Sequence, residues 1–262
     1  MSTGIQSRKG YSEVNGLSMY YEIYGQGRPL VLIHGGGSTI QTSFANIIPH
    51  LAKQRQVIAM DLQAHGRTND RNTDLTFIQD ADDVAALLKN LAIPKADILG
   101  FSNGGHTAIE IALRHPGIIN RLILCSAFYK RTAVVPQFWE GFDHVTLNDM
   151  PQSLRDGYLS VNNNPDGLLN MFNKDVQKMK VFEDWTDEQM KSIKSPTLVI
   201  NSTVDVGSPE HAVDMYRIIP DCELVILPGR HGAYMGTIEY LENSKWEQTY
   251  SVEIIEEFLN KG

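Results

Sequence analysis

The sequence predicts an α/β fold: a mostly parallel central sheet with helices on both faces and an inserted helical cap. Short apolar runs alternate with helical patterns along most of the 262 residues. The run at 29–33 is continuously apolar, as expected of a buried central strand. This alternation stops between residues 129 and 194 and resumes at 196–200. We therefore predict a core formed by residues 1–128 and 195–262, with residues 129–194 as the cap.

The first part of the chain predicts a β-hairpin followed by alternating elements. Asn15-Gly16, between strand-like runs at 11–14 and 17–24, is a strong signal for a two-residue turn. Thr76 and Gln79 have the spacing of a capping box at the start of an amphipathic helix. Beyond the hairpin we expect helices at 42–53, 76–91, 104–114, 209 onwards and 250–259, and strands at 29–33, 56–60, 95–99, 121–125, 196–200 and 223–227.

Composition excludes several classes of function. The net charge of −8 disfavours nucleic acid, which needs a basic face. No apolar run approaches the length of a membrane span, and the first nine residues lack the apolar core of a secretory signal. We therefore expect a cytoplasmic protein, as a monomer or homodimer, that meets a small-molecule substrate and no membrane. Cys125 and Cys222 lie in apolar runs and read as free thiols.

The segment Gly100-Phe101-Ser102-Asn103-Gly104 follows a predicted strand and opens a predicted helix. A G-x-S-x-G string in that position is typical of the nucleophile elbow of serine hydrolases, although the string alone is weak evidence. Glycines at 100 and 104 leave room for a sharp, strained turn. Such a turn exposes the Ser102 hydroxyl at the positive end of the helix, so Ser102 is the predicted nucleophile.

A serine nucleophile needs a base, and the base needs an anion to orient it. In a parallel sheet these groups lie in loops after the carboxyl ends of strands. Asp205 follows the strand ending at Ile200, and His231 follows the strand ending at Leu227. The order Ser102, Asp205, His231 is the one expected for this arrangement. The remaining histidines read as structural or surface residues.

The run His34-Gly35-Gly36-Gly37 directly follows the strand at 29–33. Glycines let the backbone approach a substrate oxygen and leave an N–H group free. We expect the backbone N–H groups of Gly36 and Asn103 to form the oxyanion hole, with His34 bracing the loop. A phosphate-binding loop is the rival interpretation, but no Lys-Ser/Thr pair follows.

These motifs resemble the α/β-hydrolase fold family, in its small single-cap esterase and lactonase-like branch. The resemblance includes residues 61–68, Asp61-Leu62-Gln63-Ala64-His65-Gly66-Arg67-Thr68, and spans nearly the whole chain. It implies the fold and the serine chemistry, but no particular substrate. The chain departs from the family pattern at Ala64, Thr68, Ser202 and Arg230, none of which is a reacting group. Ser102 disfavours the family's aspartate-nucleophile branch.

The predicted cap is rich in aromatic and methionine side chains, most of which we expect to pack within the protein while a few line an apolar pocket over Ser102. They are Phe138, Trp139, Phe142, Tyr158, Met171, Phe172, Met179, Phe182 and Trp185. The sequence thus predicts cleavage of a small or medium uncharged ester or lactone through an acyl-enzyme, without cofactor or metal. The alternatives are a thioester or C–C bond hydrolase with the same triad, and a ligand-sensing protein on this scaffold with slow or no turnover.

Overall fold

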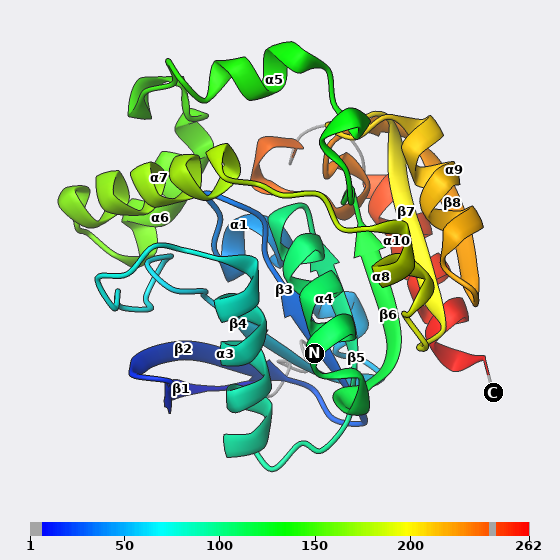
Figure 1. The fold of residues 1–262 in the computed structure, drawn as a ribbon. Coiled ribbons are helices and arrows are strands. Elements are labelled where there is room, and N and C mark those ends of the chain that lie inside the picture. The colour runs from blue at the N-terminus through cyan, green and yellow to red at the C-terminus, as the bar shows by residue number, and fades with distance from the viewer. Residues whose placement is uncertain (1–6, 241–244, 262) are drawn as a thin grey trace.

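One eight-stranded sheet runs through the part of the chain that the computed structural model describes, residues 7–240 and 245–261 (Figure 1). Its strand order is β1-β2-β4-β3-β5-β6-β7-β8. The pairs β1–β2 and β2–β4 are antiparallel, and the other neighbours run parallel, which confirms the mostly parallel sheet. The strands are β1 (Ser7–Val14), β2 (Leu17–Tyr24), β3 (Arg28–Ile33), β4 (Arg55–Met60), β5 (Ala96–Phe101), β6 (Ile119–Cys125), β7 (Thr197–Val204) and β8 (Cys222–Arg230).

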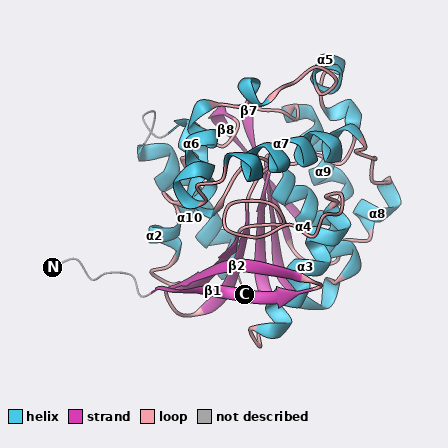
Figure 2. Cartoon of the chain, turned by 90° about the vertical axis from the view of Figure 1, so that its left-hand side faces the viewer, coloured by secondary structure: helices cyan, strands magenta, loops and turns pink. Residues whose placement is uncertain are grey.

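Helices cover both faces of the sheet, as Figure 2 shows. Alternate side chains of β3 point to opposite faces because strand side chains have a period of two. Val31 and Ile33 pack in the cluster with α3 (Phe77–Asn90), α4 (Asn103–Arg114) and α9 (Pro209–Ile218). Leu30 and Leu32 pack on the other face, with α1 (Ile40–Phe44), α2 (Ile48–Leu51) and α10 (Lys245–Asn260). The sheet is therefore buried on both sides, and its strand ends are the accessible places for a site.

The hairpin between β1 and β2 has the predicted turn. Asn15 and Gly16 have φ values of 47° and 78°. Positive φ at both central residues is the signature of the turn type that matches the twist of paired strands. The Asn-Gly prediction is confirmed.

Two predictions about helices need correction. Residues 42–53 do not form one helix: α1 ends at Phe44 and α2 begins at Ile48, where Pro49 fits the first turn of a new helix. At the start of α3 only half of the capping box forms. The Thr76 hydroxyl accepts from the Gln79 N–H, but the Gln79 side chain donates to Asp83 instead of turning back to Thr76.

The segment between β6 and β7 lies above the carboxyl ends of the strands in Figure 1. We call residues 129–194 the cap segment. Its helices are α5 (Pro136–Gly141), α6 (Gln152–Val161), α7 (Pro165–Lys180) and α8 (Asp187–Lys191). Met150, Tyr158, Leu168 and Met171 form a small apolar cluster of its own. No helix of the described residues is both long and apolar enough to cross a bilayer.

Candidate active site

Ser102 stands at the turn between β5 and α4. Its φ of 54° and ψ of −122° are strained for a residue with a side chain. A Cβ at position 100 would overlap the Gly104 carbonyl, and a Cβ at position 104 would overlap the Ile33 carbonyl, so only glycine fits at either position. The Ser102 N–H donates to the Cys125 carbonyl oxygen at 2.8 Å, which fixes the turn to the neighbouring strand. The sequence motif thus produces a sharp strand-to-helix turn with serine at its apex.

Asp205 and His231 meet at the same edge of the sheet. Asp205 follows β7 and His231 follows β8, and His231 Nδ1 lies 2.5 Å from Asp205 Oδ1. The Asp205 side chain is fully buried, whereas that of His231 is 24% exposed. This contact occupies Nδ1 and leaves the Nε2 side of the ring for another partner.

The Asp205 carboxylate is held by several donors. Ser126 Oγ donates to its Oδ2 at 2.7 Å, and the Ser202 N–H does so at 2.9 Å. Burial alone would raise the pKa of Asp205, but the hydrogen bond and charge of His231, with these donors, hold the pKa below its ordinary value. The group therefore remains an anion at neutral pH, as an orienting partner for an imidazole must.

Two contributors to this edge were not predicted from the sequence. Ser126 has a φ of 51° directly after β6, and its hydroxyl also contacts the Tyr234 hydroxyl at 2.8 Å. No local sequence signal marks this hydroxyl, because its partner Asp205 lies 79 positions further along the chain. Ser202, where the resemblance leads one to expect glycine, donates through its own hydroxyl to the Arg230 carbonyl at 2.9 Å. This bond ties β7 to the residue before His231.

The glycine loop after β3 passes close to Ser102. A Cβ on Gly35 would lie 3.2 Å from the Ser102 Cβ, and one on Gly36 would lie 2.6 Å from Asn103 Nδ2. No described residue accepts a hydrogen bond from the backbone N–H of Gly36 or Asn103. Both N–H groups are therefore available beside Ser102. His34 braces the loop as expected, since its ring lies 2.8 Å from the Gly35 carbonyl and accepts from the Leu62 N–H at 3.0 Å.

A cavity of about 490 Å³ brings these groups together. Ser102, His231, Gly36 and Asn103 all line it, and the cap segment supplies about half of the wall. Its polar members include three carboxylic acids, and none of the described lining residues is a lysine or arginine. The acids are Asp149, Asp175 and Glu239.

The nine aromatic and methionine side chains singled out in the cap all pack in apolar clusters, and four of them also line the cavity. Phe138, Phe142, Phe172 and Met179 line the cavity. The other five pack in apolar clusters: Phe182, Trp185 and Trp139 against the core, and Tyr158 and Met171 within the cap segment. The carboxylates in the cavity wall were not predicted from the sequence, because acidic residues are usually exposed and only packing brings these three to one cavity.

Comparison with known proteins gives the family. A family model described as alpha/beta hydrolase fold matches residues 28–169, more than half of the chain. The 2-hydroxymuconate semialdehyde hydrolase of Pseudomonas sp. (strain CF600) is 40% identical over 105 residues, covering 38% of this chain and 36% of the relative. A 2-hydroxy-6-oxo-6-(2'-aminophenyl)hexa-2,4-dienoic acid hydrolase from Metapseudomonas resinovorans is 31% identical over 117 residues, covering 44% of this chain and 40% of the relative.

A solved structure extends the likeness to nearly the whole chain. The enol-lactonase from Burkholderia xenovorans LB400 superposes with a TM-score of 0.75 at 21% identity, covering 96% of this chain and 100% of that one. At this identity the superposition shows the fold alone. The two curated relatives are matched over less than half of their own length. The family match and the strand order with its serine turn agree: the chain belongs to the α/β-hydrolase fold family.

Proposed function

We propose that this protein is a serine hydrolase that cleaves small or medium, uncharged carboxylic esters or lactones through an acyl-enzyme on Ser102. The observation that carries the proposal is the 2.5 Å contact between His231 Nδ1 and Asp205 Oδ1, in a cavity that Ser102 also lines. A buried carboxylate on one ring nitrogen fixes the tautomer that leaves the other nitrogen free to accept a proton.

The proposed reaction has two stages. Ser102 Oγ attacks the carbonyl carbon while its proton passes to His231 Nε2, and the alcohol then leaves with that proton. In the second stage His231 Nε2 takes a proton from a water molecule as its oxygen attacks the acyl carbon. The bond from that carbon to Ser102 Oγ then breaks, His231 returns the proton to Oγ, and the acid is released. Asp205 stays ionised throughout and stabilises the imidazolium. The N–H groups of Gly36 and Asn103 bind the oxyanion that forms in each stage.

The character of the cavity supports an uncharged substrate. Its wall is mainly apolar, with phenylalanines from both the core and the cap segment. Asp175 is paired with His65, but Asp149 and Glu239 have no lysine or arginine beside them among the described lining residues, so the wall disfavours an anionic substrate. The volume of about 490 Å³ lies in the range of small-molecule sites.

Cleavage of a C–C bond is the second candidate, favoured by the two curated relatives. One of them is named as the hydrolase of a dienoic acid, and the Ser-His-Asp set would suit that chemistry as well. The acidic cavity wall argues against a substrate that carries a free carboxylate. We therefore place neutral esters and lactones first.

The test is a rate comparison over a panel of neutral esters, lactones, thioesters and dienoic acids, for wild type and Ser102→Ala. We expect turnover of neutral esters or lactones, and a loss of several powers of ten in Ser102→Ala because a triad acts as a unit. A fluorophosphonate probe should label Ser102, located by peptide mass spectrometry. Labelling of a different serine would overturn the assignment.

The same panel separates an enzyme from a ligand sensor. A hydrolase continues after the first equivalent of product, whereas a sensor with a slow triad releases at most about one product per protein molecule. If every ester gives a single turnover, the proposal of an enzyme is wrong. If only the dienoic acids are cleaved, the second candidate replaces the first.

A further inference from the structure

One carboxylate of the cap segment reaches the glycine loop beside Ser102. Asp175 on α7 accepts a hydrogen bond at its Oδ2 from the Gly37 N–H at 2.6 Å. The same oxygen lies 2.9 Å from His65 Nε2. Asp175 is only 8% exposed. A single buried oxygen therefore joins the cap helix, the glycine loop and the loop that carries His65.

The hydrogen-bond partners define the charge of His65. Its Nδ1 lies 2.8 Å from the Gln63 carbonyl oxygen, and its Nε2 faces the Asp175 carboxylate. Both partners are acceptors, so both ring nitrogens must donate, and His65 is an imidazolium in this arrangement. His34, whose ring centroid lies 4.9 Å away, has one acceptor and one donor as partners and is neutral.

The groups around His65 agree with this assignment. Asp175 and Lys178 face it from α7 and His34 from the glycine loop, while Asp80 of α3 holds Lys178 at 2.7 Å. Burial alone would lower the pKa of His65, but the charge and hydrogen bond of Asp175 turn this into a net rise. Burial alone would raise the pKa of Asp175, but the charge and hydrogen bond of His65 lower the pKa of that carboxyl to about 2. Burial lowers the pKa of His34 to about 3.

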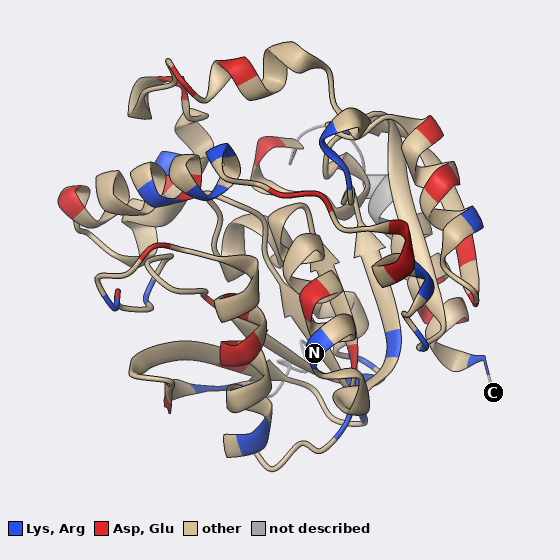
Figure 3. Ribbon diagram, viewed as in Figure 1, with Lys and Arg blue, Asp and Glu red and all other residues tan. Residues whose placement is uncertain are grey.

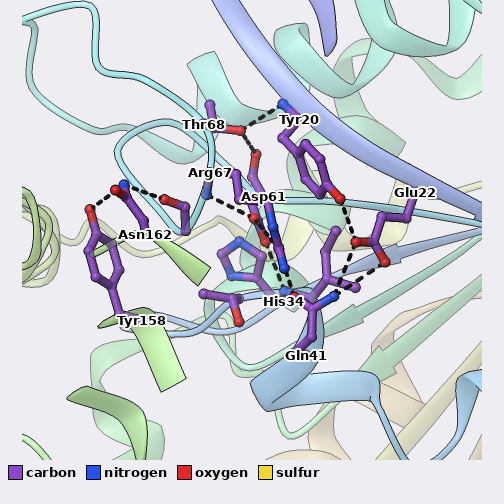
Figure 4. A network of polar contacts seen from close by, with 12 residues as sticks. Tyr20, Glu22, His34, Gln41, Asp61, Arg67, Thr68, Tyr158 and Asn162 are labelled. Carbon is purple, nitrogen blue, oxygen red and sulfur yellow. Dashed lines mark hydrogen bonds and ion pairs between the residues drawn. The ribbon is translucent and has the colours of Figure 1, made fainter. Parts of the chain in front are cut away.

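The loop that carries His65 is itself rigidly held, as Figure 4 shows for its neighbours. Asp61 Oδ1 accepts from the Ile40 N–H at 2.9 Å, and its Oδ2 accepts from the Arg67 N–H at 3.0 Å. Thr68 Oγ1 donates to the Asp61 carbonyl oxygen at 2.6 Å. Asn162 of the cap segment donates to the Gly66 carbonyl at 2.7 Å. Because this loop is fixed, His65 can hold Asp175 in one position.

We propose that Asp175 is a positioning residue that, paired with charged His65, holds the Gly35–Gly37 loop in the conformation needed for the oxyanion hole. Docking of α7 would thereby complete the catalytic site, because the cap carboxylate binds the N–H next to Gly36. This inference rests on the proposed function, since it gives the loop a role in acyl transfer at Ser102. Because a buried ion pair is weak evidence for stability, the positioning role rests on the hydrogen bond from the Gly37 N–H to Asp175.

The rival explanation is that Asp175 only anchors α7. The helix has a second buried ion pair for comparison: Lys178 Nζ lies 2.7 Å from Asp80 Oδ2, and among the described residues it donates no hydrogen bond to the glycine loop. An anchor-only role predicts that breaking either pair has the same kinetic effect. A positioning role predicts that only the Asp175 pair affects the chemical step.

The experiment compares steady-state hydrolysis of 4-nitrophenyl butyrate by wild type, Asp175→Asn and Lys178→Met, with Asp166→Asn as the charge-matched control on the exposed start of α7. We expect Asp175→Asn to lower kcat about tenfold to a hundredfold with a smaller change in KM, because the oxyanion is bound only in the transition state. Asp166→Asn should match wild type, and Lys178→Met should retain most of its kcat when folded.

A pH series adds a readout that a simple anchor would not move. Wild-type kcat should fall at alkaline pH as His65 loses its proton, and in Asp175→Asn this limb should shift to lower pH because the imidazolium has lost its anion. The shift of the His65 ring signals with pH, followed by NMR, reports the same titration without any activity. If Asp175→Asn fails to fold, His65→Gln, which should abolish the alkaline limb, replaces it.

The outcomes separate this inference from the proposed function. If Ser102→Ala is inactive and Asp175→Asn behaves like Asp166→Asn, the inference is wrong while the proposed function stands. Equal losses of kcat in Lys178→Met and Asp175→Asn, or an effect of Asp175→Asn on KM alone, would also overturn it. If Ser102→Ala remains active, the proposed function is wrong, and a raised His65 pKa found by NMR would support only the charge assignment.

Discussion

Two helices of the cap segment, α5 and α7, are held to the rest of the protein in different ways. No residue of α5 is fully buried, and the exposed ion pair between Lys180 and Asp143 joins its end to α7. In contrast, α7 places a buried carboxylate and a buried ammonium against the core, on His65 and Asp80. Figure 3 shows the basic residues of α7 as blue bands, and Figure 1 shows α5 standing farther from the sheet.

This difference separates two tasks within one segment. Buried charges require specific partners at fixed distances, so α7 can hold the glycine loop in one geometry. Apolar contacts tolerate changes of shape, so α5 can vary the wall of the cavity without moving the catalytic groups. We therefore expect changes at α5 to alter substrate choice and changes at α7 to alter stability and catalysis.

The largest expected effect lies outside the cap segment and tests whether the chemistry belongs to the core. Asp205→Asn should hold His231 in the wrong tautomer and reduce kcat by about 10⁴-fold, the loss known for the Ser-His-Asp template. The fold should persist, checked by circular dichroism and thermal unfolding. Near-full activity in this variant would mean that a different carboxylate orients His231.

The next largest effect is on stability, and it distinguishes the buried ion pair of α7 from its exposed one. The side chains of Lys178 and Asp80 are 3% and 2% exposed. Lys178→Met leaves the Asp80 charge buried without a partner, so it should lower the free energy of unfolding by about 3–5 kcal/mol. Lys180 and Asp143 are 35% and 68% exposed, so Lys180→Met should cost less than about 1 kcal/mol. Urea unfolding of both variants provides the measurement. Equal losses in the free energy of unfolding would mean that the buried and exposed ion pairs do not differ in strength.

A smaller effect is expected on substrate choice at α5. Phe138 lines the cavity, whereas its neighbour Trp139 packs under Arg131, with 4.0 Å from the guanidinium carbon to the ring centroid. Phe138→Ala should change the difference in activation free energy between short and medium acyl esters by about 1–3 kcal/mol. Trp139→Ala should change this difference less. The ratio of kcat/KM across the ester series is the measurement. The opposite ranking would show that the wall of the cavity is built differently.

The smallest expected effect is a pH dependence of stability at α7. The pKa of Asp175 is lowered from 3.8 to about 2. The contribution of this carboxylate to folding stability is therefore complete above pH 3.8 and is lost as the pH falls through about 2. His65 has a pKa raised from 6.5, so its contribution is complete below that value and is lost as pH rises through the raised one. The difference in Tm between wild type and Asp175→Asn should thus be largest between pH 3.8 and pH 6.5, the ordinary pKa values of the two groups. A difference independent of pH would contradict the ion pair.

Local sequence signals were enough for the elements and residues that depend on near neighbours. The Asn15-Gly16 turn, the continuously apolar β3 and the glycines around Ser102 each satisfy a steric or burial requirement within a few residues. Asp205 and His231 could be selected because parallel strands bring their carboxyl ends to one edge. Their roles as catalytic groups remain a prediction. The break between α1 and α2 was missed because Pro49 can begin a helix as well as interrupt one.

Tertiary structure decided which polar groups meet across long stretches of chain. His65 and Asp175 are 110 positions apart, and Ser126 and Asp205 are 79 apart, so no periodicity or spacing links them. The sequence by itself determined the strand-helix alternation, the serine turn and the aromatic content of the cap segment, because these follow from local sterics and from the burial of apolar side chains. The acidic cavity wall and the charged state of His65 follow from packing, because a buried group's charge depends on which donors and acceptors surround it.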